Sequence, residues 1–143
     1  MKTKAILYLL LVLLLITACS GKKPGKVEGD STKSSDFVFE EEKSIELAER
    51  GVLHMIKTEY DDFRKISTDK LTEALSEEVL KEVETKVLNP SGEFEELVKH
   101  KFSEIKDKDG NKYAQVLVHA KYTKADRVFT VVIDNDYKIS GFF

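Results

Sequence analysis

The stretch KYAQVLVHAKYT, residues 112–123, has the clearest strand pattern in the chain. Val116, Val118, Ala120 and Tyr122 share one face, with Leu117 on the other, and a period of two is that of a β-strand. Three further segments show the same short period: residues 97–106, 127–134 and 138–143. The sequence therefore predicts four strands in its C-terminal half.

The links between these segments are short and rich in turn-forming residues. DKDGN at 107–111, KAD at 124–126 and NDY at 135–137 have the length and composition of hairpin turns. Hairpin links join strands that run antiparallel and lie side by side. We therefore expect a four-stranded antiparallel meander, in which each strand pairs with the next one along the chain.

The chain before this sheet has the longer period of helices. Between residues 40 and 66 apolar residues recur every three or four positions, which indicates a helix with one buried face. Gly51 is the weak point of this pattern. A break near residues 58–61, rather than one continuous rod, would divide the stretch into a long helix and a short one.

Two further helical pieces are expected before the sheet. Ser67 or Thr68 is placed to cap the first piece, and Ser76 to cap a helix over residues 76–88, because serine and threonine favour helix N-caps. The NPSG turn at 89–92 is expected to end the helical half. Helices followed by strands predict an α+β domain, with N-terminal helices packed on the meander.

Neither face of the predicted sheet is cleanly polar. In residues 127–134, Phe129 and Val131 lie on one face and Val128 and Val132 on the other. Helices can bury the apolar side chains of one face, and those of the second face require burial against another surface. A homodimer formed through the sheet is one expected partner arrangement.

The N-terminus resembles that of bacterial lipoproteins. Lys2 and Lys4 precede a run of 12 residues, 5–16, that is too short for a transmembrane helix, which needs about 20. Small residues then lead to Cys19, the only cysteine. The resemblance implies a signal peptide over residues 1–18, a diacylglyceryl group on Cys19, and a protein anchored in the cell membrane that faces outside the cytoplasm.

Residues 19–36 are rich in glycine, serine and lysine and predict a flexible lipidated tether, which leaves 37–143 for a single domain. The reach of such a tether is on the order of 20–25 Å. Loss of Lys2 and Lys4 with the signal takes the formal charge from −3 to about −5. This net charge argues against nucleic acid as a partner.

The order of helices and strands, closed by VVID at 131–134 and KISGFF at 138–143, resembles the family known as domain of unknown function 3887. That family is a cystatin-like group related to the nuclear transport factor 2-like fold. The resemblance implies a bent sheet around helices with a cone-shaped cavity. It carries over no catalytic residues, and this wider fold serves enzymes, binding proteins and dimerisation modules alike.

Motifs for metal or cofactor chemistry are missing from the sequence. DKDGN at 107–111 is acidic, but its glycine stands at the fourth position of a calcium loop instead of the sixth. The histidines have no zinc spacing, Asp61 and Asp62 point about 100° apart on a helix, and no phosphate-binding glycine loop is present. We therefore expect neither a metal nor a cofactor.

Two classes of function remain open. The first is a non-catalytic module that binds an unknown protein or a small apolar ligand at the cell surface. The second is a small-pocket hydrolase or isomerase, in which His100 or His119 meets Tyr60 or a helix carboxylate in a cavity between helices and sheet. The two classes differ in whether polar groups converge in a pocket.

Overall fold

The computed structural model describes residues 37–143. Its helical half contains α2 (Glu41–Ile56), α3 (Tyr60–Lys65), α4 (Asp69–Ala74), α5 (Glu77–Val83), a π-helical stretch η2 (Glu84–Leu88) and α6 (Asn89–Ser91). The strands β1 (Phe94–Lys106), β2 (Lys112–Tyr122), β3 (Arg127–Ile133) and β4 (Ile139–Phe142) follow. The predicted α+β class is confirmed. None of the helices in this range combines the length and hydrophobicity needed to span a bilayer.

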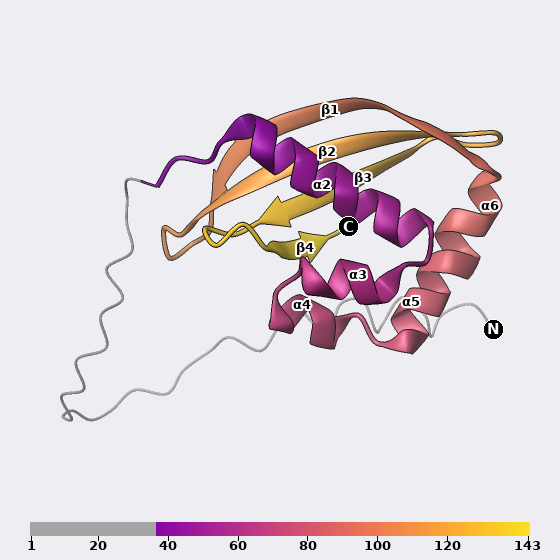
Figure 1. Ribbon diagram of the computed structural model, residues 1–143, viewed down its shortest axis with the longest axis horizontal. Helices are drawn as coiled ribbons and strands as arrows, with labels where there is room; N and C mark the ends of the chain where they lie inside the picture. Colours follow the sequence, from indigo (N-terminus) through magenta and orange to yellow (C-terminus); the bar gives the residue numbers. More distant parts are fainter. Residues whose placement is uncertain (1–36) are drawn as a thin grey trace, which may run out of the picture. The chain divides into compact units, whose positions relative to one another are not determined.

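The four strands form one antiparallel sheet in the order β1-β2-β3-β4, which is the predicted meander. Figure 1 shows β1 and β2 as long, curved strands and β4 as a short strand at the opposite edge. The register is continuous between β2 and β3, where Val116 pairs with Val131 and Val118 with Phe129. These pairs bring the buried residues of both strands to the same face.

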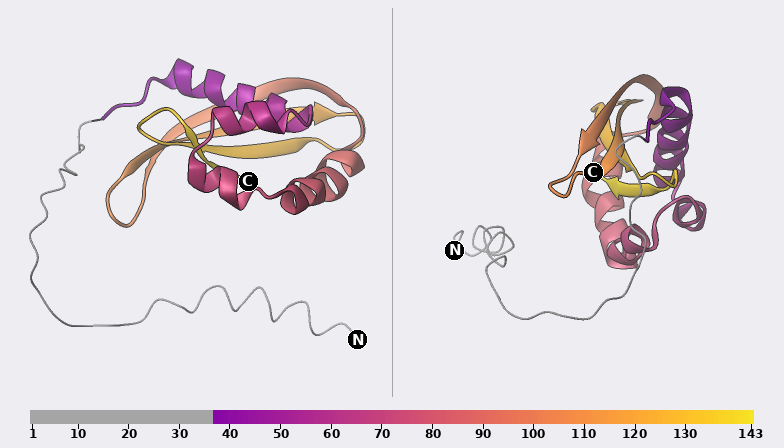
Figure 2. Two further views of the ribbon diagram at one scale, coloured as in Figure 1. Left: turned by 60° about the horizontal axis from the view of Figure 1, so that its bottom comes forward. Right: turned by 90° about the vertical axis from the view of Figure 1, so that its left-hand side faces the viewer.

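α2 lies across this face and contacts all four strands (Figures 1 and 2). We call it the inner face. Its most buried side chains are apolar residues of α2 and the strands, joined by Phe63 of α3. The fully buried members include Val52, Met55, Phe63, Val116, Val118, Val131, Ile133 and Ile139. Burial of apolar area of this kind stabilises the domain at about 25 cal/mol per Å².

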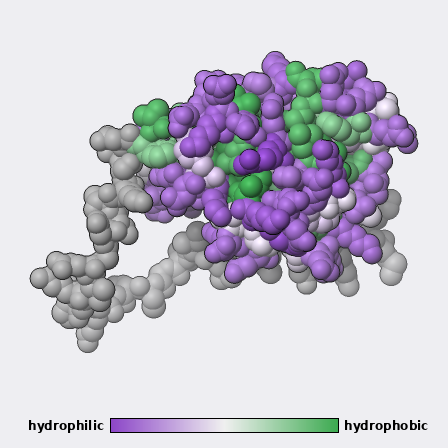
Figure 3. All heavy atoms as spheres, in the orientation of Figure 1, coloured by the Kyte–Doolittle hydropathy of each residue, from purple (hydrophilic) through white to green (hydrophobic). Residues whose placement is uncertain are grey.

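The opposite side of the sheet, which we call the outer face, carries half-buried or exposed side chains. Its members alternate with the core residues along β2 and β3: Tyr113, Gln115, Leu117, His119, Val128, Thr130 and Val132. Val128 is 51% exposed. This pattern agrees with the prediction that neither face is cleanly polar, since the inner face is apolar and the outer face carries Leu117, Val128 and Val132. The side of the molecule that carries α2 is mainly hydrophilic, with hydrophobic residues in separate patches (Figure 3).

The predicted helix break is confirmed, since α2 ends at Ile56 and α3 begins at Tyr60. Thr58 between them has a φ of 57°. Of the two candidate caps for α4, Thr68 is the one whose hydroxyl accepts the Leu71 N–H, at 3.3 Å. Ser76 caps α5 by accepting the Val79 N–H.

The NPSG segment ends the helical half, as predicted, but only at its last residue. Residues Asn89–Ser91 continue the helix as α6, because proline is tolerated in a first helical turn, where its missing N–H leaves no bond unmade. The stop comes at Gly92, whose φ of 87° is a left-handed value that favours glycine. β1 then begins at Phe94, three residues earlier than predicted.

Candidate functional site

The three residues predicted for a pocket do not meet in the structure. His100 of β1 pairs with Val118 and therefore lies on the inner face, whereas His119 of β2 pairs with Lys99 and lies on the outer face. Tyr60 begins α3. Because the sheet separates the two histidines, they cannot serve one cavity.

His100 does meet a carboxylate from the helices. Its Nδ1 lies 3.2 Å from Oε1 of Glu49 on α2, and both side chains are partly exposed, at 46% and 37%. The pair bridges the edge strand β1 to α2. It lines neither of the two hollows described below.

Tyr60 lines a hollow of about 410 Å³ between α3 and α5. Its hydroxyl has no hydrogen-bond partner among residues 37–143. Burial raises the pKa of this phenol above its usual value of 10.0, and the negative charge of Glu84 adds a smaller increase. Arg64, Glu77 and Lys81 give the hollow mixed charges. A protonated phenol without a basic partner is poorly suited to act as a general base.

A second hollow, which we call the α4 hollow, has a volume of about 720 Å³ and lies between α4, the strands and the C-terminus. Its lining is mostly apolar and comes from segments far apart in the sequence: Leu71 and Leu75 at α4, Ile105 of β1, Tyr113 of β2, Val132 of β3, and Gly141, Phe142 and Phe143 at the C-terminus. Volumes of this size accommodate small ligands.

Two residues shape the wall of this hollow at the end of the chain. Phe143 is 77% exposed, which is unusual for a large aromatic side chain. Gly141 pairs with Val132, and a β-carbon at position 141 would lie 3.0 Å from the Phe143 ring and 3.2 Å from Cβ of Val132. The missing side chain at Gly141 therefore keeps this part of the hollow open.

The carboxylates at the rim of the α4 hollow are engaged by their own turns. Oδ1 of Asp134 accepts the N–H groups of Asp136 and Lys138, at 3.0 and 2.9 Å. Asp107 accepts the Asn111 side-chain amide at 2.8 Å, together with two backbone N–H groups of the β1–β2 turn. These hydrogen bonds lower the pKa of Asp107 from its usual value of 3.8, and the bond from the Asn111 side chain contributes most.

Two lysines at the same rim have no carboxylate partner among the described residues. Lys70 of α4 and Lys106 of β1 line the hollow. Among residues 37–143, neither ammonium group lies within 4.0 Å of a carboxylate. The α4 hollow thus combines an apolar wall with cationic groups that are free to contact an anion.

Sequence reasoning did not find the α4 hollow. The exposed aromatic ending of the chain was the one available signal for it, since large apolar residues at a surface commonly mark a binding site. The remaining predicted site residue, Cys19, lies outside the described residues, as do the predicted signal peptide at 1–18 and tether at 19–36.

Comparison with known proteins supports the fold and gives no activity. Residues 48–142 match the family model described as "Protein of unknown function (DUF3887)". The structure is similar to the "NMR structure of protein from Ruminococcus gnavus ATCC 29149", with 25% sequence identity and a TM-score of 0.64; the match covers 73% of this chain and 90% of that one. Among curated proteins, none matches the chain.

Proposed function

Because the chain belongs to the DUF3887 family, for which no function is known, its role has to be inferred from its own surface, and we propose that it is a lipid-anchored binding module. It acts outside the cytoplasm and holds an amphipathic ligand in the α4 hollow. The ligand has an apolar chain and an acidic head group. The domain is not an enzyme in this proposal.

The proposal rests on the composition of the α4 hollow, which has an apolar wall and two lysines without carboxylate partners at a rim that also carries two carboxylates held by their own turns. Leu71, Val132 and Phe143 offer the wall, and burial of an apolar chain against them releases about 0.8 kcal/mol per CH₂ group. Lys70 and Lys106 offer charge-assisted hydrogen bonds to a carboxylate or phosphate. The rim carboxylates Asp107 and Asp134 already accept hydrogen bonds from their own turns.

The predicted anchor places the domain where such ligands are abundant. A diacylglyceryl group on Cys19 would keep residues 37–143 within the reach of the tether from a bilayer. Lipids and their hydrolysis products carry an apolar chain and an acidic head, which is the chemistry of the α4 hollow.

The test measures binding of dansylated undecanoic acid to residues 37–143 through the change in the fluorescence of the dansyl group. This fragment contains the whole connected apolar core of the described residues. We expect saturable binding of one probe per chain. Phe143→Ala and Lys106→Glu should each weaken it at least about five-fold, since a contact of about 1 kcal/mol corresponds to that factor.

Matched controls come from the outer face away from the hollow. Val128→Ala removes an exposed apolar side chain, and Lys99→Glu makes the same charge change on β1; both should leave binding unchanged. The methyl ester of the probe should bind more weakly than the acid. Equal loss in variants and controls, or no saturable binding, would exclude this function.

A second copy of the chain is the competing occupant of the outer face. Sedimentation of the same fragment separates the two ideas. A dimer that is disrupted by Val128→Glu, together with absence of probe binding, would show that the apolar residues of this face serve the predicted homodimer instead.

A further inference from the structure

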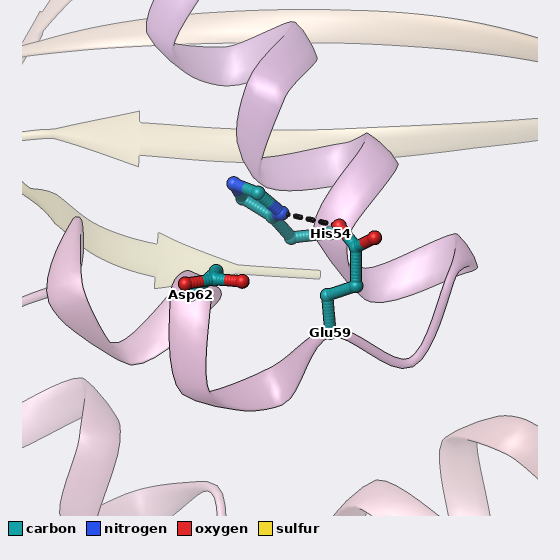
Figure 4. Close-up of side chains that lie close together, drawn as sticks. All are labelled: His54, Glu59 and Asp62. Atoms are coloured by element: carbon teal, nitrogen blue, oxygen red, sulfur yellow. Dashed lines mark hydrogen bonds and ion pairs between the residues drawn. The ribbon is translucent and has the colours of Figure 1, made fainter.

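We propose that His54, Glu59 and Asp62 form a binding site for a divalent transition metal ion, with Zn²⁺ as the best-suited ion. The side chains come from the end of α2 and the start of α3, and they offer one imidazole nitrogen and two carboxylate oxygens. Their three ligand atoms lie within 4.8 Å of one another. Figure 4 shows all three gathered at the corner between the two helices.

The distances suit a tetrahedral ion after small side-chain rotations. Nδ1 of His54 lies 2.8 Å from Oε2 of Glu59. Ligand atoms at the usual zinc distances of about 2.0–2.2 Å are separated by roughly 3.3–3.5 Å in tetrahedral geometry. The His54–Glu59 separation is shorter than this value, and none of the three separations exceeds 4.8 Å. Three protein ligands would leave a fourth position for water.

The backbone of the corner is fixed, so the ligands are held in place before an ion arrives. The Glu59 N–H donates to the His54 carbonyl at 2.8 Å, and Thr58 between them adopts a left-handed φ of 57°. Met55 and Phe63, each 1% exposed, anchor the two helices in the core on either side of the corner. A preorganised set of ligands loses less conformational freedom on binding.

Both carboxylates come from the same end of α3. Glu59 is the N-cap residue of this helix, and Asp62 lies in its first turn. The exposed fractions of the side chains are 21% for His54, 45% for Glu59 and 51% for Asp62, so solvent and ions have access.

Lys65 is the group that competes with the ion. Its ammonium lies 2.7 Å from Oδ1 of Asp62, and this hydrogen bond is the main reason that the pKa of Asp62 lies below 3.8. An ion that binds Asp62 therefore has to replace this ammonium group. Because the Lys65 side chain is 74% exposed, it can leave Asp62 at little energetic cost.

The ligand types favour transition metal ions over Mg²⁺. An imidazole nitrogen with two carboxylates suits Zn²⁺, Ni²⁺ or Cu²⁺, whereas Mg²⁺ requires near-octahedral oxygen ligands. The site is also distinct from the α4 hollow, with which it shares no residue. The two proposals can therefore fail independently.

The test is calorimetric titration of Zn²⁺ into the full-length chain, purified in detergent micelles and freed of metal with a chelator. We expect one saturable site per chain. His54→Ala and Asp62→Asn should each lower the affinity at least about ten-fold, since loss of even an outer-shell partner of a metal ligand has an effect of this size. Mg²⁺ should show no saturable binding.

Two variants distinguish a metal site from a structural ion pair. Lys65→Ala removes the competing cation and should raise the Zn²⁺ affinity several-fold, although it removes an ion pair from the protein. His100→Ala is the matched control, because His100 contacts a single carboxylate, Glu49, and should leave the affinity unchanged. All of these variants retain Cys19, so any contribution of its sulfur is the same in each of them.

Circular dichroism shows whether each variant remains folded. Zn²⁺ affinity that is unchanged in folded His54→Ala and Asp62→Asn, or absence of saturable binding to the full chain, would overturn the proposal. So would a Lys65→Ala variant that binds the ion more weakly than the original chain.

Discussion

Gly51 of α2 lies directly against the Cδ1 methyl group of Ile139 on β4. A β-carbon at position 51 would overlap that methyl group, and the ring of Phe63 lies 3.6 Å away on another side. Gly51 is buried and Ile139 is fully buried. Gly51, which weakens the helix pattern in the sequence, is therefore the residue at which α2 approaches the edge strand β4.

Gly51→Ala should destabilise the domain despite the higher helix propensity of alanine. The propensity gain is about 1 kcal/mol, whereas overpacking of a filled core costs typically about 1–3 kcal/mol. We expect a net loss of about 1 kcal/mol in the free energy of unfolding, measured by urea denaturation of residues 37–143.

Ile139→Val supplies the control for this prediction, because it removes the methyl group that alanine would meet. The single change should cost about 0.5–1.5 kcal/mol. In the double variant the two losses should be less than additive, as expected for residues in contact. A Gly51→Ala variant that is more stable than the original chain would contradict the packing argument.

Asp107 should make stability depend on pH. Its pKa is lowered in the folded state, chiefly by the Asn111 side chain, so the native state favours the ionised carboxylate. The stabilisation is present above the unfolded value of 3.8 and is lost as the pH falls through the lower folded value. Asp107→Asn should therefore reduce the urea midpoint at pH 7 and have less effect well below pH 3.8.

Asp109→Asn is the matched change in the same turn. Among the described residues, the Asp109 carboxylate accepts none of the turn's hydrogen bonds, and only its backbone N–H takes part. This variant should leave the midpoint nearly unchanged at neutral pH. An equal effect of both changes would show that net charge, and not the hydrogen-bonded turn, determines the pH dependence.

Cys19→Ala should release the protein from the membrane. In the predicted anchor, two acyl chains contribute about 0.8 kcal/mol per buried CH₂ group. Two chains anchor a protein stably in a bilayer, whereas a single chain binds only weakly and reversibly. The measurement is the distribution of the protein between membrane and soluble fractions after an alkaline wash. Ser20→Ala is the neighbouring control and should stay with the membrane; retention of Cys19→Ala would contradict the lipoprotein prediction.

Local patterns predicted most elements of the fold. The period of two along 112–123 and the hairpin turns at 107–111 and 135–137 correspond to β2 and the meander of the structure. The break before Tyr60 and the Ser76 cap were likewise predicted. These features depend on neighbouring residues, and so periodicity and turn chemistry are sufficient to locate them.

The candidate sites could not be predicted in the same way. His100 and His119 both lie within predicted strands, and the strand register assigns them to opposite faces. His54 and Glu59 are five residues apart, a spacing that a continuous helix would not bring onto one face. The left-handed turn at Thr58 brings them together.

The order and type of the elements follow from local sequence patterns, because each element is specified by residues within a few positions of one another. The positions of the candidate sites depend on long-range packing. The α4 hollow joins Leu71, Ile105 and Phe143, which become neighbours only after α4 has packed beside β4 and the meander has closed. Such contacts depend on packing between distant segments, and no local pattern encodes them.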